Sequence, residues 1–149
     1  MQEVETTRVR DDAELATRLR LVLMRLSRRL RRQAGDDLSP SLVSALATLE
    51  RRGPLTLGQL AALEGVKPPS ITRMVAALER TALVSRESDV SDRRVTRLTV
   101  TDEGRSTLQR SRTRKTAYLA TQLATLDDAE AARLGDALRI LERLLESDR

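Results

Sequence analysis

Side chains that donate hydrogen bonds recur along the segment "PPSITRMVAALER", which begins at Pro68. Proline fits the first turn of a helix, because the N–H that it lacks would have no partner there, so a helix is predicted. Its apolar residues form one stripe: Ile71, Val75 and Leu78. The opposite side then carries the donors Ser70, Thr72, Arg73 and Arg80. In a major groove, arginine can bond guanine through two hydrogen bonds, and hydroxyls can bond bases or phosphates. The alternative is a solvated helix face that carries arginines.

A second group of charges lies in "DVSDRR", between the β-branched runs "LVSRES" and "VTRLTVT". The two runs predict a hairpin with an exposed tip, which holds Asp89, Asp92, Arg93 and Arg94. An arginine at such a tip could enter a narrow minor groove, whose negative potential attracts a guanidinium. The charges could instead stabilise a turn, in which aspartate is common. The Asp92 carboxylate could also hold Arg86 or Arg94 in place.

The stretch "TLGQLAALEG" predicts a short helix just before the donor-rich one. Thr56 and Gln59 have the spacing of a capping box, and Leu60 and Leu63 are expected to face inward. Gly65 can adopt the left-handed conformation that turns the chain. Two helices joined by a tight glycine turn form a helix-turn-helix, and the hairpin that follows would be its wing.

Longer amphipathic helices are predicted on both sides of this unit. One covers residues 13–33, a second starts at Pro40 behind the cap Ser39, and a third starts at Thr101. The last helix has a leucine stripe: Leu134, Leu138, Leu141 and Leu145. Terminal helices of a small protein often bury such a stripe in a partner chain, although packing within one chain remains an alternative.

Charge and composition favour a polyanionic partner. The 149 residues include 27 Lys and Arg against 22 Asp and Glu, a formal net charge of +5, and the sequence pI is about 10.8. Phe and Trp are absent and Tyr118 is the sole aromatic residue. Binding that relies on stacking bases against aromatic side chains is therefore disfavoured, whereas a duplex read by a helix and arginines remains open.

The same composition argues against an enzyme. The chain has no Cys and no His, so thiol nucleophiles, disulfides, zinc fingers and imidazole bases are excluded. Neither a G-x-S-x-G motif nor a P-loop is present, and we expect no cofactor and no metal. The N-terminus lacks the apolar core of a signal peptide and no apolar run approaches a membrane span, so a cytoplasmic protein without a membrane partner is expected.

The order of helices, together with "PPSITRMVAALERTALVSR" and "DVSDRRVTRLTVTDEG", resembles the MarR (multiple antibiotic resistance regulator) family of bacterial transcription factors. The resemblance covers nearly the whole chain. Its specific parts are the D-x-R wing, here Asp92 to Arg94, and the T-x-x-G close, here Thr101 to Gly104. Two mild departures are that Ala82 begins the "ALV" found where the family has "GLV", and that Val100 precedes Thr101 where the family has "LT".

This resemblance implies a mainly α fold with a small β-wing. A winged helix-turn-helix lobe over residues 38–101 would sit on a helical dimerisation frame formed by residues 11–35 and 104–147. It also implies a homodimer with one lobe per subunit on pseudo-palindromic double-stranded DNA. The DNA-binding residues that we expect are Thr56, Lys67, Pro69, Ser70, Thr72, Arg73, Arg86, Arg93 and Arg94. Of these, Ser70, Thr72 and Arg73 match the family's major-groove positions, Arg94 matches its minor-groove arginine, and Thr56 and Lys67 match common phosphate contacts.

Members of the family often bind small aromatic or amphipathic molecules between frame and lobe, and release DNA as a result. Candidate ligand-binding residues here are Met24, Arg25, Leu46 and Tyr118, each of which could equally be ordinary core or surface. The basic run "RSRTRK", Arg110 to Lys115, could be a solvated helix face.

The function that we expect is therefore a sequence-specific, homodimeric transcriptional regulator that represses a gene and can be released by a small ligand. The alternative is an architectural DNA-binding protein with little sequence preference. Binding to random and inverted-repeat duplexes at one salt concentration distinguishes the two.

Overall fold

The computed structural model describes residues 2–35, 38–89 and 91–146. Val90, in the expected hairpin tip, and Ser147, at the end of the expected frame, lie outside the described residues. The elements follow in the order α1 (Gln2–Ala34), α2 (Pro40–Arg52), α3 (Leu57–Glu64), α4 (Pro68–Arg80), β1 (Val84–Ser88), β2 (Thr96–Val100), α5 (Asp102–Leu123) and α6 (Asp128–Glu146). The chain is thus mainly helical with one two-stranded antiparallel sheet, as expected.

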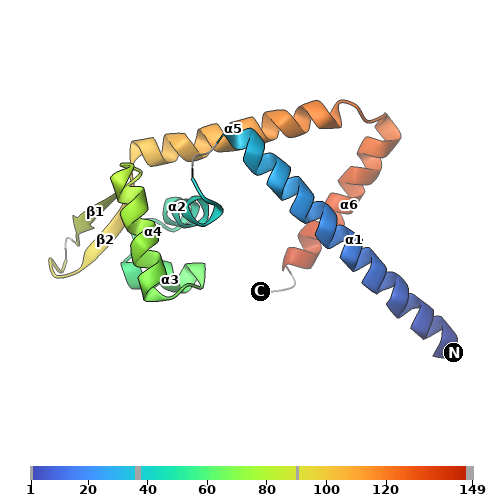
Figure 1. Ribbon diagram of the computed structural model, residues 1–149, viewed down its shortest axis with the longest axis horizontal. Helices are drawn as coiled ribbons and strands as arrows, with labels where there is room; N and C mark the ends of the chain where they lie inside the picture. The colour runs from blue at the N-terminus through green and yellow to red at the C-terminus, as the bar shows by residue number, and fades with distance from the viewer. Residues whose placement is uncertain (1, 36–37, 90, 147–149) are drawn as a thin grey trace.

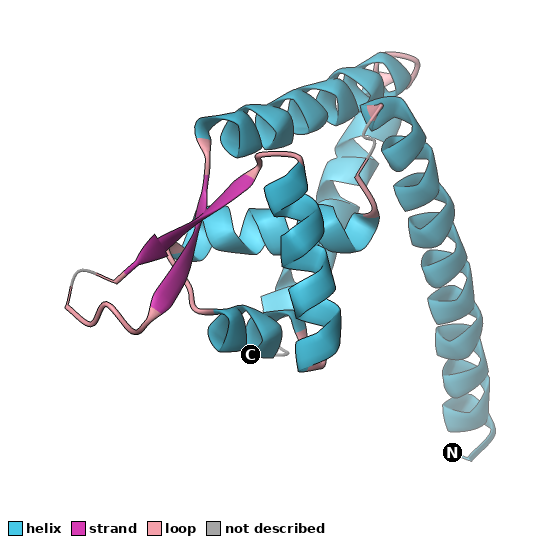
Figure 2. Cartoon of the chain, turned by 60° about the vertical axis from the view of Figure 1, so that its left-hand side comes forward, coloured by secondary structure: helices cyan, strands magenta, loops and turns pink. Residues whose placement is uncertain are grey.

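The helices α2, α3 and α4 and the hairpin gather at one end of α5, while α1 and α6 extend from the rest of it (Figure 1). Although α1 and α6 cross in that view, they stand apart in a turned view (Figure 2). In the described part of the chain, α1 packs extensively only against α5, and α6 packs extensively against no element. None of the described helices is both long and apolar enough to cross a membrane.

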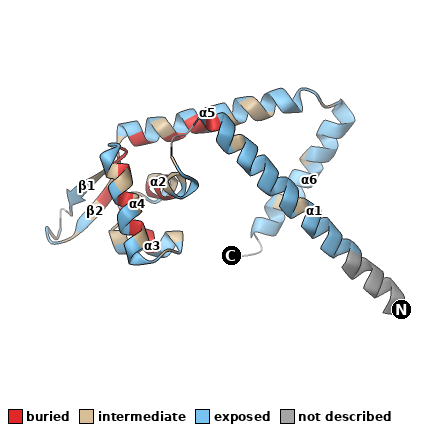
Figure 3. Cartoon of the chain, viewed as in Figure 1, coloured by how far each residue is buried: buried red, intermediate tan, exposed pale blue. Residues whose placement is uncertain are grey.

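The hydrophobic core lies in the lobe formed by α2, α3, α4, the hairpin and the start of α5 (Figure 3). Its largest fully buried side chains are Leu46, Leu49, Leu60, Ile71, Val75, Leu78 and Leu98. The strands pair from Val84 opposite Val100 to Ser88 opposite Thr96. An isolated bridge between Leu55 and Leu98 adds the segment before α3 to this sheet.

Local sequence signals account for most helix boundaries. The Thr56–Gln59 capping box is present, and Gly65 ends α3 with φ 63° and ψ 31°, in the left-handed region. Ser39 caps α2, where its side chain accepts a hydrogen bond from the Leu42 N–H. Thr101 caps α5 in the same way, through the Gly104 N–H.

Three expectations need correction. Leu63 does not face inward but is 50% exposed, because the short α3 directs Leu60 and Ala61 into the core instead. The first helix begins at Gln2, well before the expected start at residues 11–13. The strands are shorter than the β-branched runs, since Leu83 lies in the turn after α4 and Thr101 serves as the cap of α5.

Candidate nucleic-acid interface

The apolar stripe of α4 faces the core as predicted, because Ile71, Val75 and Leu78 are fully buried. The donors therefore lie on the other side, where Thr72, Arg73 and Arg80 are exposed and Ser70 is half-buried. Two of these side chains are turned back along their own helix. The Thr72 Oγ1 donates to the Pro68 carbonyl at 2.9 Å, and the Arg73 Nε donates to the Pro69 carbonyl at 3.3 Å.

These two contacts leave much of the donor capacity of the face unused. The Arg73 guanidinium has five N–H bonds, and among the described residues only the one at Nε has a partner. Its two terminal nitrogens therefore remain free for a bidentate contact with a base or a phosphate. Arg80, in the last turn of α4, is exposed and its side chain makes no hydrogen bond in the described part of the chain.

Three further expected residues lie at the starts of two helices, α3 and α4. The Thr56 Oγ1 accepts a hydrogen bond from the Gln59 N–H at 3.2 Å, which leaves its own hydroxyl hydrogen available to donate. Lys67 is the exposed, extended residue before α4 and makes no side-chain cap bond there. Pro69 is exposed in the first turn of α4. Helix starts of this kind present N–H groups and positive partial charge, which suits phosphates.

The wing tip is organised around the Asp89 carboxylate. It accepts hydrogen bonds from the Ser91 N–H at 2.8 Å and the Asp92 N–H at 3.2 Å, and also from the Ser91 hydroxyl and the Arg97 Nε. The bond from the Ser91 hydroxyl, followed by the one from Arg97, holds the pKa of Asp89 far below its usual value. Asp89 is therefore a structural residue of the turn, which is the role that the sequence left open for it.

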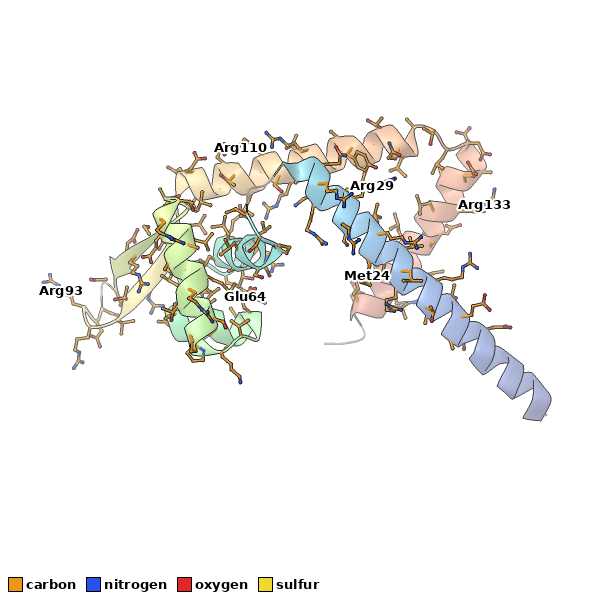
Figure 4. The ribbon with its side chains drawn as sticks, viewed as in Figure 1. Met24, Arg29, Glu64, Arg93, Arg110 and Arg133 are labelled. Atoms are coloured by element: carbon orange, nitrogen blue, oxygen red, sulfur yellow. The ribbon has the colours of Figure 1, made fainter. Side chains whose placement is uncertain are left out.

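Asp92 holds Arg94. The Arg94 Nε and Nη2 lie 3.1 Å and 3.3 Å from the two carboxylate oxygens of Asp92, while the Arg94 side chain stays 90% exposed. The side-chain bond to Arg94 lowers the pKa of Asp92. Of the two arginines considered as partners for Asp92, the structure thus pairs it with Arg94. Arg93 points away from the hairpin at the tip (Figure 4).

Arg86 pairs with α4 instead of Asp92. Its Nε and Nη2 lie 2.6 Å and 3.2 Å from the two carboxylate oxygens of Glu79, a bidentate contact between β1 and α4. The hydrogen bond to Glu79 raises the pKa of Arg86. Sequence reasoning missed Glu79, because its partner lies on a different element and no local pattern marks the pair.

The four expected ligand-binding residues do not come together. Leu46 is fully buried in the lobe core, and Tyr118 is half-buried on α5. Met24 and Arg25 line two separate hollows along α1, of about 330 Å³ and 450 Å³. A different cavity, of about 180 Å³, lies where α1, α2 and α5 meet, and is lined by Arg31, Leu38, Pro40, Val43 and Lys115.

Comparisons with known proteins show the family and the fold of this chain. The model of the MarR family matches residues 38–96. The chain is 38% identical over 136 residues to an HTH-type transcriptional regulator of Mycobacterium tuberculosis, covering 91% of this chain and 95% of the relative. It is 29% identical over 113 residues to the HTH-type transcriptional repressor MdtR of Bacillus subtilis, covering 76% and 73%. The solved structure of a MarR family protein from Bacillus stearothermophilus superposes with a TM-score of 0.76 at 27% identity, covering 92% and 96%.

Proposed function

This chain belongs to the MarR family of DNA-binding transcriptional regulators, and on that premise we propose that it is a repressor that binds a pseudo-palindromic operator as a homodimer. The observation that carries the proposal is that α4, with its donor face, and the wing share one hydrophobic core and are joined by an ion pair. The Glu79–Arg86 pair joins the helix to the first strand. A helix and a wing held in this way can read two adjacent grooves at once.

Each expected DNA-binding residue has a role in this proposal. Ser70, Thr72 and Arg73 read base edges in the major groove. Arg94 enters the minor groove at the flank, already oriented by Asp92. The remaining residues bind or border the phosphate backbone, which fixes the register of the protein on the duplex: Thr56, Lys67, Pro69 and Arg93.

Arg86 has a structural role in addition to the DNA contact that the sequence suggested. Two of its nitrogens are committed to Glu79, which leaves Nη1 for a phosphate. Its main contribution is therefore to hold the wing at a fixed angle to α4.

The homodimer is supported by apolar surface that a single chain leaves uncovered. On α6, Leu138 is 50% and Leu145 is 74% exposed, and on α1, Leu15 is 63% exposed. Because α6 has no extensive packing in the described chain, its stripe needs a cover, and a second copy provides a matching one. We assign α1, α6 and the second half of α5 to the dimerisation frame, and residues 38–101 together with the start of α5, which carries the core residue Leu108, to the lobe.

Repression and its release complete the proposal. The relative MdtR is named a repressor. A dimer bound to an operator near a promoter represses by blocking access to the promoter.

The cavity between α1, α2 and α5 suits a small organic acid, since Arg31 and Lys115 supply positive charge and Leu38 and Val43 supply apolar walls. A ligand there would touch both frame and lobe and could shift one against the other.

The test begins with selection of genomic fragments by the purified protein. The recovered sequence is then compared with a random duplex in a titration at one fixed salt concentration. A sequence-specific regulator should prefer the recovered sequence by at least about a thousandfold, and that sequence should contain an inverted repeat. An architectural protein would bind both duplexes nearly equally, and that result would reject the proposal.

A further inference from the structure

The basic run Arg110 to Lys115 on α5 is not among the proposed DNA-binding residues, and its arginines have definite partners. The Arg110 Nη2 bonds Glu103 within α5 at 2.8 Å, and Figure 4 shows Arg110 on the side of α5 away from α2. In contrast, the Arg112 Nη2 lies 2.6 Å from the Glu50 Oε2 on α2. The Arg114 Nη1 donates at 2.8 Å to the carbonyl oxygen of Ala34, the last residue of α1. Two neighbouring arginines therefore reach two different helices.

The helical repeat explains this division. Residues two apart on a helix point about 200° apart, so Arg112 and Arg114 leave α5 on nearly opposite sides. Arg112 reaches into the lobe, where the Glu50 side chain is 21% exposed. Arg114 reaches the frame, where Ala34 is fully buried.

The C-terminal end of α1 suits the Arg114 guanidinium in both charge and shape. The last carbonyls of a helix lack partners within the helix and carry negative partial charge, which a guanidinium satisfies. Gly35 follows with φ +60°, and a Cβ there would lie only 2.9 Å from the Arg114 Nη1. The glycine at position 35 therefore leaves room for the Arg114 guanidinium at the end of α1.

These two contacts lie at the joint between lobe and frame. Leu108, earlier on α5, belongs to the lobe core, whereas α1 packs on α5 from the frame side. Gly35, which follows α1, lies against the Arg114 side chain of α5, and Leu38, before α2, lines a cavity together with Lys115 of α5. The angle between the lobe and α1 therefore depends on how α5 holds α2 and the end of α1.

We propose that Arg112 and Arg114 are positioning residues that fix this angle and so set the spacing of the half-sites that the dimer accepts. The inference rests on the proposed homodimer, because a spacing exists only when two lobes bind together. A dimer with a stiff joint tolerates one half-site spacing. A looser joint lets each lobe follow a displaced half-site with little loss of binding free energy.

The experiment uses the full-length protein and the operator recovered by the selection above, with one or two base pairs inserted or deleted at its centre. Arg112→Ala should lower the preference for the natural spacing roughly three- to fivefold, the factor expected for one partly exposed ion pair. Arg114→Leu should act in the same direction. Arg110→Ala is the matched control, because it removes the same charge and an ion pair from the same helix without touching the joint.

The exchange Glu50→Arg with Arg112→Glu should restore the spacing preference if the pair itself sets it. Binding to a single half-site and thermal melting show that each variant is folded. The inference is overturned if Arg112→Ala keeps the spacing profile of Arg110→Ala, or if the exchange fails to restore a preference that Arg112→Ala has lost. A wild-type protein without preference for the inverted repeat would reject the proposed function instead, so the two failures are distinguishable.

Discussion

At the scale of single residues, the wing arginine combines exposure with a fixed orientation. Arg94 is almost fully exposed, but Asp92 holds its Nε and Nη2, so less side-chain freedom would be lost in the proposed minor-groove contact. The lowered pKa of Asp92 means that this hold is present above the ordinary aspartate pKa and is lost only as pH falls through the lowered value. The wing should therefore keep its shape at neutral and mildly acidic pH.

Arg73 and Arg94 should fail differently when replaced, because the proposed function places them in different grooves. Arg73→Ala should cost about 1–3 kcal/mol on the operator while sparing weak binding to random DNA. Arg94→Ala should weaken binding most when the flanks are A·T-rich. Arg94→Lys should rescue only part of the loss, since lysine is more strongly hydrated and cannot make the same two-point contact with Asp92.

The measurement is a titration of each variant on the operator, a flank-substituted operator and a random duplex at one salt concentration. Equal losses for both alanine variants on all three duplexes would mean that the arginines act only as phosphate clamps.

Ala82 offers a second residue-level prediction. It is the one non-glycine residue with positive φ, 55°, among those that the structure describes, and it stands where the family has glycine. A left-handed alanine is strained, whereas glycine is not, although glycine also gains freedom in the unfolded chain. Ala82→Gly should therefore raise the free energy of unfolding by about 0.5–1 kcal/mol in urea titrations. Ala76→Gly, within α4, is the control and should lower it by about 1 kcal/mol.

At the scale of elements, the sequence predicted those features that depend only on neighbouring residues. The proline start of α4, the capping box of α3 and the hairpin were all predicted from neighbouring residues. The Arg112–Glu50 pair could not be, because its members are 62 residues apart and meet only after α5 packs on α2. Leu63 was misplaced because apolar spacing cannot tell which of two possible faces a short helix buries.

The start of α5 yields a prediction at this scale. A Cβ at Gly104 would lie 2.3 Å from the Leu83 carbonyl oxygen and 2.8 Å from the Val100 Cγ1, so α5 approaches the turn after α4 more closely than any side chain allows. The Thr101 hydroxyl also donates to the Ala82 carbonyl there, at 2.7 Å. Gly104→Ala should lower the free energy of unfolding by about 2–3 kcal/mol.

Gly58 on α3 provides the matched comparison, because a Cβ there meets nothing within 4 Å and its φ is not positive. Gly58→Ala should raise the free energy of unfolding by about 0.5–1 kcal/mol. If Gly104→Ala raises the urea midpoint as Gly58→Ala does, the close approach at Gly104 does not limit the fold.

At the scale of the whole molecule, burial is uneven. The lobe holds the hydrophobic core, whereas the described parts of α1 and α6 expose most of their apolar side chains. A helix with few contacts in its own chain contributes little stability alone, because the burial of an apolar face is what holds most protein helices. The frame of a single chain should therefore be the part that depends on a partner.

Two leucines of equal exposure can measure that dependence. Leu138 on α6 and Leu63 on α3 are each 50% exposed, so replacing either with glutamate should cost a single chain about the same. If a second copy covers α6, Leu138→Glu buries a charge at the interface and removes an apolar contact from both subunits at once. We expect the dissociation constant of the dimer to rise at least roughly a hundredfold, and Leu63→Glu to leave it unchanged. Light scattering across a range of micromolar concentrations measures the constant for the wild type and both variants. A wild type that stays monomeric, or two variants that shift equally, would show that the stripe of α6 is not covered by a second copy.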